Sequence, residues 1–280
     1  MSGAQIINGK ELAQSIKNEL KEKIKDHNKK PHLAIVLAGN DEASQIYVRN
    51  KLKSAEEIGF ATSLHLFNQD VTQKEIEDTI IELNQNSDVN GIMVQLPLPK
   101  QIDEKKILNL IDYKKDVDGF HPYNIGLLQS GSSDAVIAAT PKGIIRLLDE
   151  AKIDFTGKNA LVIGRSQIVG KPIAMLLLNK NCTVTIAHSK TTDLESLINN
   201  ADIIVAACGC PKLIKGSSIK NNAVIIDVGI NRLNGKLCGD VDFDSAVEKA
   251  SYITPVPGGV GPMTIAMLLE NTYQAFLKQQ

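Results

Sequence analysis

Residues 160–172 read ALVIGRSQIVGKP, an apolar run that ends at Gly164 and is followed by a second glycine, Gly170, and a proline. A strand, a glycine turn and a helix in this order let the backbone approach a pyrophosphate, which the helix N-terminus then stabilises. The spacing is not G-x-G-x-x-G, because Ser166 stands where the second glycine would be. It is not a P-loop either, because Pro172 replaces the Ser or Thr that holds magnesium. The context predicts a dinucleotide site, and the alternative is a tight turn with a purely structural role.

Strand-like and helix-like runs alternate on both sides of this segment. The expected strands are His32–Leu37, Thr62–Leu66, Gly91–Leu96, Asn159–Ile163, Thr183–Ala187, Ile203–Ala207 and Ala223–Val228. The expected helices are Gly9–Asn28, Glu42–Gly59, Thr72–Gln85, Ile168–Asn179, Leu194–Asn199 and Gly261–Lys278. Strands so rich in Val and Ile are typical of parallel sheets buried on both faces, and the alternation predicts an α/β fold of βαβ units.

The chain is expected to form two domains. Three of the expected strands precede residue 100 and four follow residue 158, and a connector punctuated by Pro and Gly, Phe120–Gly143, lies between the two groups. The boundary is therefore placed near residue 120. Residues 1–120, rejoined by a C-terminal helix over 262–280, form one expected domain, and residues 121–261 form the other.

Composition excludes several classes of partner. With 31 basic and 32 acidic residues the formal net charge is −1, which gives no reason to expect a nucleic acid or an anionic membrane as partner. The longest apolar runs are strand-length, too short to cross a bilayer. The N-terminus does not show the pattern of a secretory signal. The four cysteines have no metal-binding spacing, so we expect no metal site and free thiols in a reducing cytoplasm.

The strand end at Ala187 bears on the choice between NAD and NADP. An NAD enzyme usually places an acidic residue there to bond the ribose 2′-hydroxyl. Here His188-Ser189-Lys190 follows, and the first acid is Asp193. Arg165, Ser189 and Lys190 offer positive charge and hydrogen-bond donors that suit a 2′-phosphate. The pattern favours NADP, and the alternative is a solvated basic loop.

Tyr47 and Lys51 lie four residues apart, which places both side chains on one face of a helix. A Tyr and a Lys at this spacing resemble the catalytic pair of short-chain dehydrogenases. In that family the pair follows the cofactor glycines, whereas here it precedes Gly164, so the order argues against that family. The alternative is an exposed Lys beside a packed Tyr.

Three further features are candidates for a functional role: Gln95, Asp118 and the segment 254–264. Gln95 is a polar amide within the apolar stretch Gly91–Pro99, and it needs partners if buried. Asp118 lies in a turn-rich segment, where either Asp118 or Asp116 could merely shape the backbone as an Asx-turn. The segment 254–264, TPVPGGVGPMT, gives a stiff and closely approachable loop that runs into a helix.

These motifs together resemble the bifunctional methylenetetrahydrofolate dehydrogenase/methenyltetrahydrofolate cyclohydrolase family. The matching segments span nearly the whole chain in one order: Tyr47-Val-x-x-Lys51, Glu57-Ile-Gly59, Gly91-Ile-x-Val-Gln95-Leu-Pro-Leu-Pro99, Lys115-Asp-Val-Asp118-Gly-Phe-His-Pro122, Val162-Ile-Gly-Arg-Ser166-x-Ile-Val-Gly170-x-Pro172, His188-Ser189, Asp227-Val-Gly-Ile230-Asn-Arg232 and Pro255–Thr264. Two departures are Ala139, where the family usually carries Cys, and Lys190, where it more often carries Arg. Lys190 keeps the charge but not the planar fork of Arg, so cofactor affinity could differ.

The resemblance implies a fold and a site. It implies an N-terminal α/β folate-binding catalytic domain, a C-terminal Rossmann-like parallel-sheet NADP domain and a cleft between them. The implied catalytic residues are Lys51, Tyr47, Gln95 and Asp118. The implied NADP-binding residues are Gly164, Arg165, Ser166, Ser189 and Ile230. The implied substrate-binding residues are Tyr47, Asp118, Gly259 and Pro262.

The implied reaction is the oxidation of 5,10-methylenetetrahydrofolate with NADP, followed by hydrolysis of the methenyl product to 10-formyltetrahydrofolate. We expect Lys51 to be the general base of the hydrolysis, held by Gln95 without the opposite charge that would keep it protonated. The family also implies a cytoplasmic homodimer acting on folates that could be polyglutamylated. Two alternatives stay open at this point: another two-domain NADP dehydrogenase such as a shikimate-type enzyme, and an inactive relative kept as a scaffold.

Overall fold

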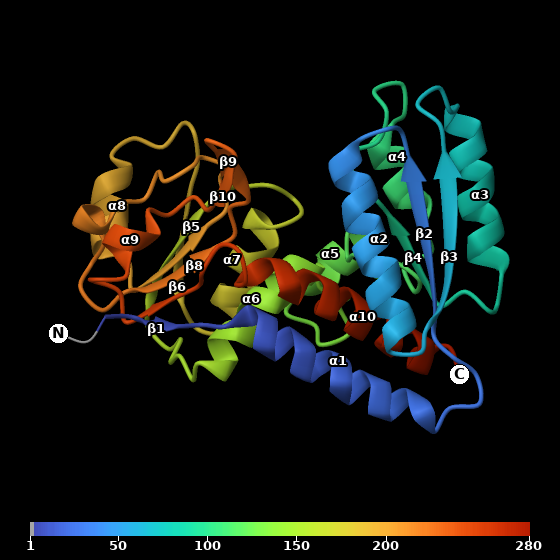
Figure 1. Cartoon of the computed structure of the whole chain (residues 1–280), viewed down its shortest axis with the longest axis horizontal. Helices are drawn as coiled ribbons and strands as arrows, with labels where there is room; N and C mark the ends of the chain where they lie inside the picture. Colours follow the sequence, from blue (N-terminus) through green and yellow to red (C-terminus); the bar gives the residue numbers. More distant parts are fainter. Residues whose placement is uncertain (1–2) are drawn as a thin grey trace. The chain divides into compact units, whose positions relative to one another are not determined.

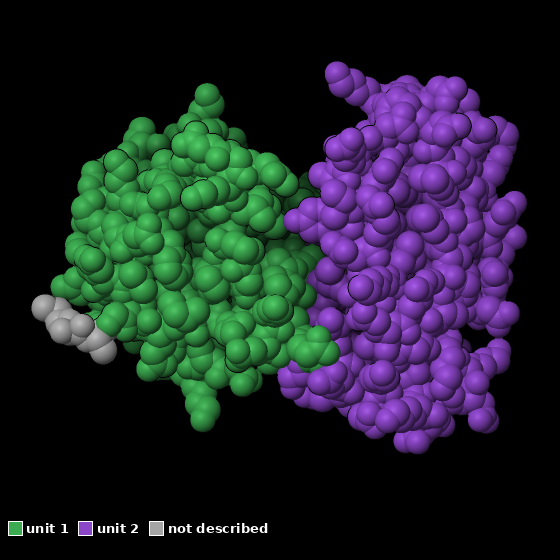
Figure 2. Space-filling view, viewed as in Figure 1, with its two compact units in different colours: residues 1–14, 140–264 green, residues 15–139, 265–280 purple. Residues whose placement is uncertain are grey.

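The computed structural model describes residues 3–280, which form two compact units (Figure 2). Of the described residues, 3–14 and 140–264 form one unit, called the nucleotide unit below. Residues 15–139 and 265–280 form the other, called the lysine unit. The division along the chain falls within three helices: α1 (Gly9–Lys25), α6 (Ala139–Glu150) and α10 (Val260–Lys278).

The lysine unit is built on a three-stranded parallel sheet in the order β3-β2-β4. Its strands are β2 (His32–Ala38), β3 (Ala61–Phe67) and β4 (Gly91–Val94). Its other helices are α2 (Glu42–Glu57), α3 (Gln73–Gln85), α4 (Glu104–Leu110) and α5 (Pro122–Gln129). Each parallel connection needs a crossover, and α2 and α3 supply the two crossovers of this sheet (Figure 1).

The faces of this sheet follow from alternation along each strand. Ala34 and Val36 of β2 join one core cluster with Ile76 and Ile80 of α3. Because successive side chains point to opposite faces, Met93 lies on the face opposite to its neighbours Ile92 and Val94 of that cluster. Helix α2 packs against β2 and β3. The alternation of β4 thus directs Met93 away from α3. Gln95, two residues further on and just past the end of the strand, points in the same direction as Met93.

Local chemistry fixes both ends of α3. At its start, Thr72 and Glu75 form a reciprocal capping box, in which each side chain accepts a hydrogen bond from the backbone N–H of the other. At its end, the buried Lys115 ammonium donates to three carbonyl oxygens, those of Leu83, Asn84 and Asn86, at 2.7–3.0 Å. A cation there satisfies carbonyls that lack helical partners and interacts favourably with the helix dipole.

The nucleotide unit contains a six-stranded sheet in the order β1-β11-β8-β7-β5-β6, with every pair parallel. Its strands are β1 (Gln5–Ile6), β5 (Asn159–Ile163), β6 (Thr183–Ala187), β7 (Ile203–Ala206), β8 (Val224–Asp227) and β11 (Tyr252–Ile253). The helices are α7 (Gly170–Asn179), α8 (Leu194–Asn200), the 3-10 turn η1 (Gly216–Ser218) and α9 (Phe243–Ala246). A separate antiparallel hairpin is made of β9 (Asn231–Leu233) and β10 (Lys236–Cys238).

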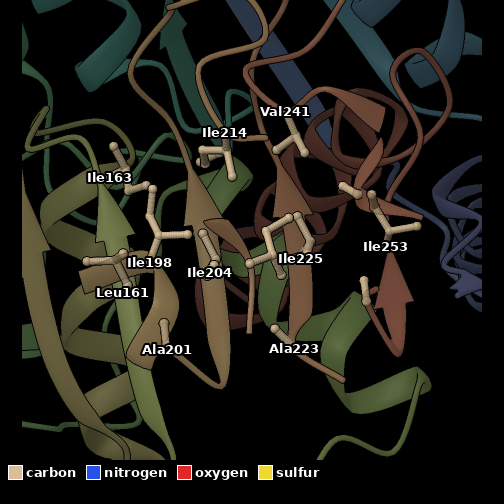
Figure 3. Packing of buried hydrophobic residues seen from close by; sticks show 14 of the residues in the cluster. Leu161, Ile163, Ile198, Ala201, Ile204, Ile214, Ala223, Ile225, Val241 and Ile253 are labelled. Atoms are coloured by element: carbon tan, nitrogen blue, oxygen red, sulfur yellow. The ribbon is translucent and has the colours of Figure 1, made fainter. Parts of the chain in front are cut away.

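The core on one face of this sheet is aliphatic. Leu161, Ile204 and Ile225, from three neighbouring strands, pack with Ile198 of α8 (Figure 3). These four side chains are at most 4% exposed. Each fully buried side chain of this size stabilises the fold by roughly 1.5–3 kcal/mol. The sheet is thus a rigid base whose strand ends present the loops.

The expected α/β fold is confirmed, and seven expected strands and six expected helices are present with ends that differ by three residues at most. The expectation that the strands are buried on both faces is wrong for the edge strands β3 and β6, most of whose side chains are partly or fully exposed. The connector expected over Phe120–Gly143 also contains α5 and the start of α6. The short strands β1, β11, β9 and β10 were not expected, although Asn234-Gly235, both with positive φ, is a typical hairpin turn.

No helix within residues 3–280 is both long enough and apolar enough to cross a membrane.

Candidate active site

Helix α2 carries Tyr47 and Lys51 on one face. Asp41 caps its N-terminus by accepting the backbone N–H of Ser44 at 2.7 Å. One turn separates Tyr47 from Lys51, so both side chains leave the helix in similar directions. Tyr47 is 42% exposed, whereas Lys51 is half-buried. The Tyr47 ring is therefore open to a ligand while the Lys51 stem is packed.

The Lys51 ammonium is held by β4 and the residue just after it. Its Nζ lies 3.0 Å from Gln95 Oε1 and 3.3 Å from Met93 Sδ. Gln95 Nε2 donates to the carbonyl of Leu96 at 2.7 Å, which fixes the amide so that its oxygen faces Lys51. The Gln95 backbone N–H in turn donates to Val36 O at 2.9 Å, so the sheet positions this residue. Gln95 therefore makes structural hydrogen bonds and orients Lys51 at the same time.

The segment after Lys115 separates the roles of two aspartates. The buried Asp116 carboxylate accepts four hydrogen bonds of 2.8–3.2 Å, from the backbone N–H groups of Gly119, Phe120 and His121 and from Asn124 Nδ2. Asp116 thus makes the turn that the sequence also allowed Asp118 to make. Among the described residues, the Asp118 carboxylate makes no such bond, so its acceptor oxygens are available to a ligand.

Tight packing fixes the position of Asp118. The carbonyl of Val117 accepts a hydrogen bond of 2.9 Å from Asn271 of α10. A side chain at Gly91 would overlap Val117. Strand β4, which leads to Gln95, and the segment that holds Asp118 are therefore packed without space for adjustment.

Burial favours the neutral forms of both ionisable groups. Desolvation lowers the pKa of Lys51, and the negative charge of Asp118 opposes that shift. Desolvation raises the pKa of Asp118 to about 7, against the opposing effect of Lys51, while Asp116 adds to the increase. An amine whose pKa is lowered in this way has a larger neutral fraction near pH 7, which is what a general base requires.

The glycines of the first quoted segment serve backbone packing. Gly164 has φ +133°, and a side chain there would overlap the carbonyl of Ala207. A side chain at Gly170 would overlap Gly164 itself. Ser166 Oγ accepts from the backbone N–H of Gly170 at 3.3 Å and so helps to begin α7. These glycines are therefore required by backbone packing, which is the structural alternative considered above. The strand, turn and helix that they join are the arrangement that a pyrophosphate site needs.

Two basic residues and a serine are exposed at the ends of β5 and β6. These strands are neighbours in register, with Ile163 opposite Ala187, so the residues that follow them lie at one edge of the sheet. Arg165, Ser189 and Lys190 are all exposed there. His188 Nδ1 accepts the backbone N–H of Lys190 at 3.1 Å, which shapes the turn. Positive charge and a hydroxyl at this edge fit a phosphorylated ribose.

The remaining expected residues follow β8 and β11, whose carboxyl ends lie at the same edge of the sheet. Ile230, just past β8, is 54% exposed, which is unusual for an isoleucine. Gly259 is buried and approaches the carbonyl of Pro255 so closely that a side chain would not fit. Pro262 lies in the first turn of α10. In doubly wound folds, ligands bind outside this edge.

Within the lysine unit, the structure brings together Lys51, Gln95 and the charge of Asp118. Within the nucleotide unit, Gly164, Arg165, Ser166, Ser189 and Ile230 all follow the carboxyl ends of strands of the six-stranded sheet. Sequence reasoning missed Asn231 and two buried carboxylates at that edge, Asp227 and Asp240. The signal available for Asp227 was its place as an acid at the end of an apolar strand.

Comparisons with known proteins match both units. The model described as the tetrahydrofolate dehydrogenase/cyclohydrolase catalytic domain matches residues 7–118, and that family's NAD(P)-binding domain matches residues 138–280. A bifunctional protein FolD of Acetivibrio thermocellus is 53% identical over 97% of this chain and 96% of its own length.

Two solved structures are similar along nearly the whole chain. The bifunctional enzyme FolD, methylenetetrahydrofolate dehydrogenase/cyclohydrolase, of Campylobacter jejuni aligns with a TM-score of 0.97 and 46% identity, over 99% of this chain and 100% of that one. The Trypanosoma brucei N5,N10-methylenetetrahydrofolate dehydrogenase-cyclohydrolase, complexed with NADP cofactor and inhibitor, aligns with a TM-score of 0.95 and 38% identity, over 99% of each chain.

Proposed function

The chain belongs to the tetrahydrofolate dehydrogenase/cyclohydrolase family, and from that premise we propose which of its residues carry the two reactions. It oxidises 5,10-methylenetetrahydrofolate with NADP to the methenyl compound and hydrolyses that product to 10-formyltetrahydrofolate. The observation that supports the assignment most strongly is the 3.0 Å contact between Lys51 Nζ and Gln95 Oε1. A lysine held by a neutral amide keeps access to its uncharged form.

Asp118 and Tyr47 bind the pterin. The Asp118 carboxylate accepts two hydrogen bonds from the amino-pyrimidinone edge, a charge-assisted bidentate pair. The exposed Tyr47 ring stacks on the pterin face. Gly259 and Pro262 are the two further residues that we assign to substrate binding. These contacts orient the methylene carbon for oxidation.

The nucleotide unit binds the cofactor through the edge of its parallel sheet. Gly164 and Ser166 receive the pyrophosphate at the N-terminus of α7. Arg165, Ser189 and Lys190 hold the 2′-phosphate, and Ile230 gives the ring portion an apolar contact. When bound, NADP accepts a hydride from the methylene carbon. No protein acid or base is needed in this step, because two nitrogens stabilise the resulting cation.

Hydrolysis requires a base, and Lys51 is that base. Water attacks the methenyl carbon and passes one of its protons to Lys51 Nζ. The remaining hydroxyl proton then moves to N5 as the bond between that carbon and N5 breaks, which leaves the formyl group on N10. Gln95 holds Lys51 in place without stabilising the ammonium as a carboxylate would. Tyr47, on the same face of α2, keeps the substrate beside the amine.

The experiment is an absorbance assay with 5,10-methylenetetrahydrofolate and either NADP or NAD, in which the bands of the reduced cofactor and the methenyl compound are separated by fitting. We expect NADP to be reduced without lasting build-up of methenyl compound, and added methenyl compound to decay faster than in buffer. Lasting build-up of methenyl compound would remove Lys51 from the proposed role.

The chain also acts as a homodimer in the cytoplasm. Strand β3 supports the dimer, because it is an edge strand whose Leu64 and Leu66 are 44% and 62% exposed. Unpaired, apolar edges are rarely left open to water. Light scattering should give twice the chain mass, and a Leu66→Glu variant should shift it toward the monomer. A wild-type mass of one chain would contradict the dimer.

A further inference from the structure

Two buried aspartates at the carboxyl edge of the nucleotide unit take no part in either reaction. Asp227 ends β8 and is 4% exposed, and Asp240 follows the β9–β10 hairpin and is fully buried. Burying a carboxylate costs free energy unless hydrogen bonds compensate it. The partners of these two groups show where that compensation is made.

The Asp240 carboxylate joins two loops. Its Oδ2 accepts the backbone N–H groups of Cys208 and Gly209 at 2.8 and 2.9 Å, in the loop after β7. Its Oδ1 accepts Asn231 Nδ2 at 2.8 Å, at the start of β9 after β8. Both oxygens are thus used, and each holds a different loop of the same sheet edge.

The Asp227 carboxylate holds the backbone of Asp240 and the start of the loop that follows β8. It accepts the backbone N–H groups of Gly229, Asp240 and Val241, each at 2.9 Å. Burial raises the pKa of Asp227 to about 6, although these three hydrogen bonds oppose the shift. A side chain at Gly239 would overlap the Asp227 carboxylate, so only glycine lets the chain after the hairpin pack this closely against it.

Ile230 lies between the two fixed points, Gly229 and Asn231. Its side chain is 54% exposed, so packing against neighbouring side chains holds it little and its position depends largely on the backbone on either side. We propose that Asp240 is a positioning residue for NADP: through Asn231 it holds Ile230 at the cofactor edge, and through Cys208 and Gly209 it holds the neighbouring loop. This role rests on the proposed NADP site at that edge.

The test is a double-mutant cycle on the Asp240–Asn231 pair, read as KM for NADP. Asn231→Ala should raise KM about tenfold, the usual effect of losing a hydrogen bond to a charged group, with kcat changed less than about twofold. Asn231→Asp should raise KM further, because two carboxylates then face each other. The double variant Asn231→Asp/Asp240→Asn exchanges donor and acceptor and should return KM to within about threefold of wild type.

Hydrolysis of added methenyltetrahydrofolate without NADP is the internal control, because it needs no cofactor site. Lys236→Ala, an exposed change on the same hairpin, is the matched control and should keep the wild-type KM. An unchanged KM in Asn231→Ala, or a double variant as impaired as Asn231→Asp, overturns the positioning role. Equal losses of hydrolysis and NADP reduction would indicate a general folding role and also overturn it. Failure of the wild-type chain to reduce NADP would instead overturn the proposed function.

Discussion

Replacing Gln95 by Glu tests the general base directly. The substitution puts a negative charge about where Oε1 lies, 3.0 Å from Lys51 Nζ. At that distance two unit charges attract by about 1.4 kcal/mol in water and about 5.5 kcal/mol at an effective dielectric constant of ~20. Since about 1.36 kcal/mol corresponds to one pKa unit, the pKa of Lys51 should rise by about 1 to 4 units.

The consequence is a loss of neutral amine. Each unit of increase lowers the uncharged fraction of Lys51 near pH 7 about tenfold, so hydrolysis should fall at least tenfold. Reduction of NADP needs no base and should fall much less. The pH at which hydrolysis reaches half its maximum should move upward by at least about one unit.

The assay follows decay of the methenyl absorbance from pH 6 to 10 in the wild type, Gln95→Glu and Gln95→Leu. Gln95→Leu is the control, because it removes both hydrogen bonds of the amide without adding charge. It should slow hydrolysis without raising the pH midpoint. Hydrolysis at the wild-type rate in Gln95→Glu, with an unmoved pH midpoint, would refute the reasoning.

Three further predictions concern Asp118, Arg165 and Asp116. Burial raises the pKa of Asp118 to about 7 from the ordinary 3.8. The folded chain therefore binds this proton more tightly than the unfolded chain, and stability falls as pH rises from about 4 to 7. Asp118→Asn should remove up to about 3 kcal/mol of the fall between pH 5 and pH 8, measured by urea unfolding at those two pH values. Arg165→Ala should raise KM for NADP about tenfold or more but leave KM for NAD nearly unchanged, and equal effects on the two cofactors would contradict the 2′-phosphate contact. Asp116→Asn should lower the free energy of unfolding by about 2 kcal/mol or more, because its amide cannot accept all four hydrogen bonds, and a wild-type urea midpoint would contradict this.

Features that depend on neighbours in the sequence were predictable. Helix α3 begins at a capping box formed by residues three apart, and the expected helix starts at the same place. The pair Tyr47 and Lys51 follows from helical spacing alone. The strands followed from their apolar runs, but which strands would be exposed did not. Strands β3 and β4 are the two edges of one sheet, yet β3 is exposed and β4 is buried, because exposure depends on what packs over each strand.

Features that depend on residues far apart in the chain were not predictable. Asp240 accepts hydrogen bonds from Cys208 and Gly209, which precede it by about thirty residues, and no periodicity in the sequence marks such a contact. The roles of Asp116 and Asp118 could not be separated either, since both stand in the same turn-rich segment. Only the direction of each carboxylate shows which one shapes the backbone.

The different roles of Asp116 and Asp118 also bear on how natural variants of this protein should be interpreted. Asp116 uses its oxygens to shape the chain, which leaves those of Asp118 for a ligand. A screen that scores only growth or turnover would rank loss of either residue alike and place both in the active site. Measurements at several temperatures would separate the two kinds of variant. A folding defect from loss of Asp116 worsens as temperature rises, whereas a ligand-binding defect from loss of Asp118 persists in cells grown at low temperature. Inherited changes at Asp116 are accordingly candidates for rescue by a bound stabilising ligand, and those at Asp118 are not.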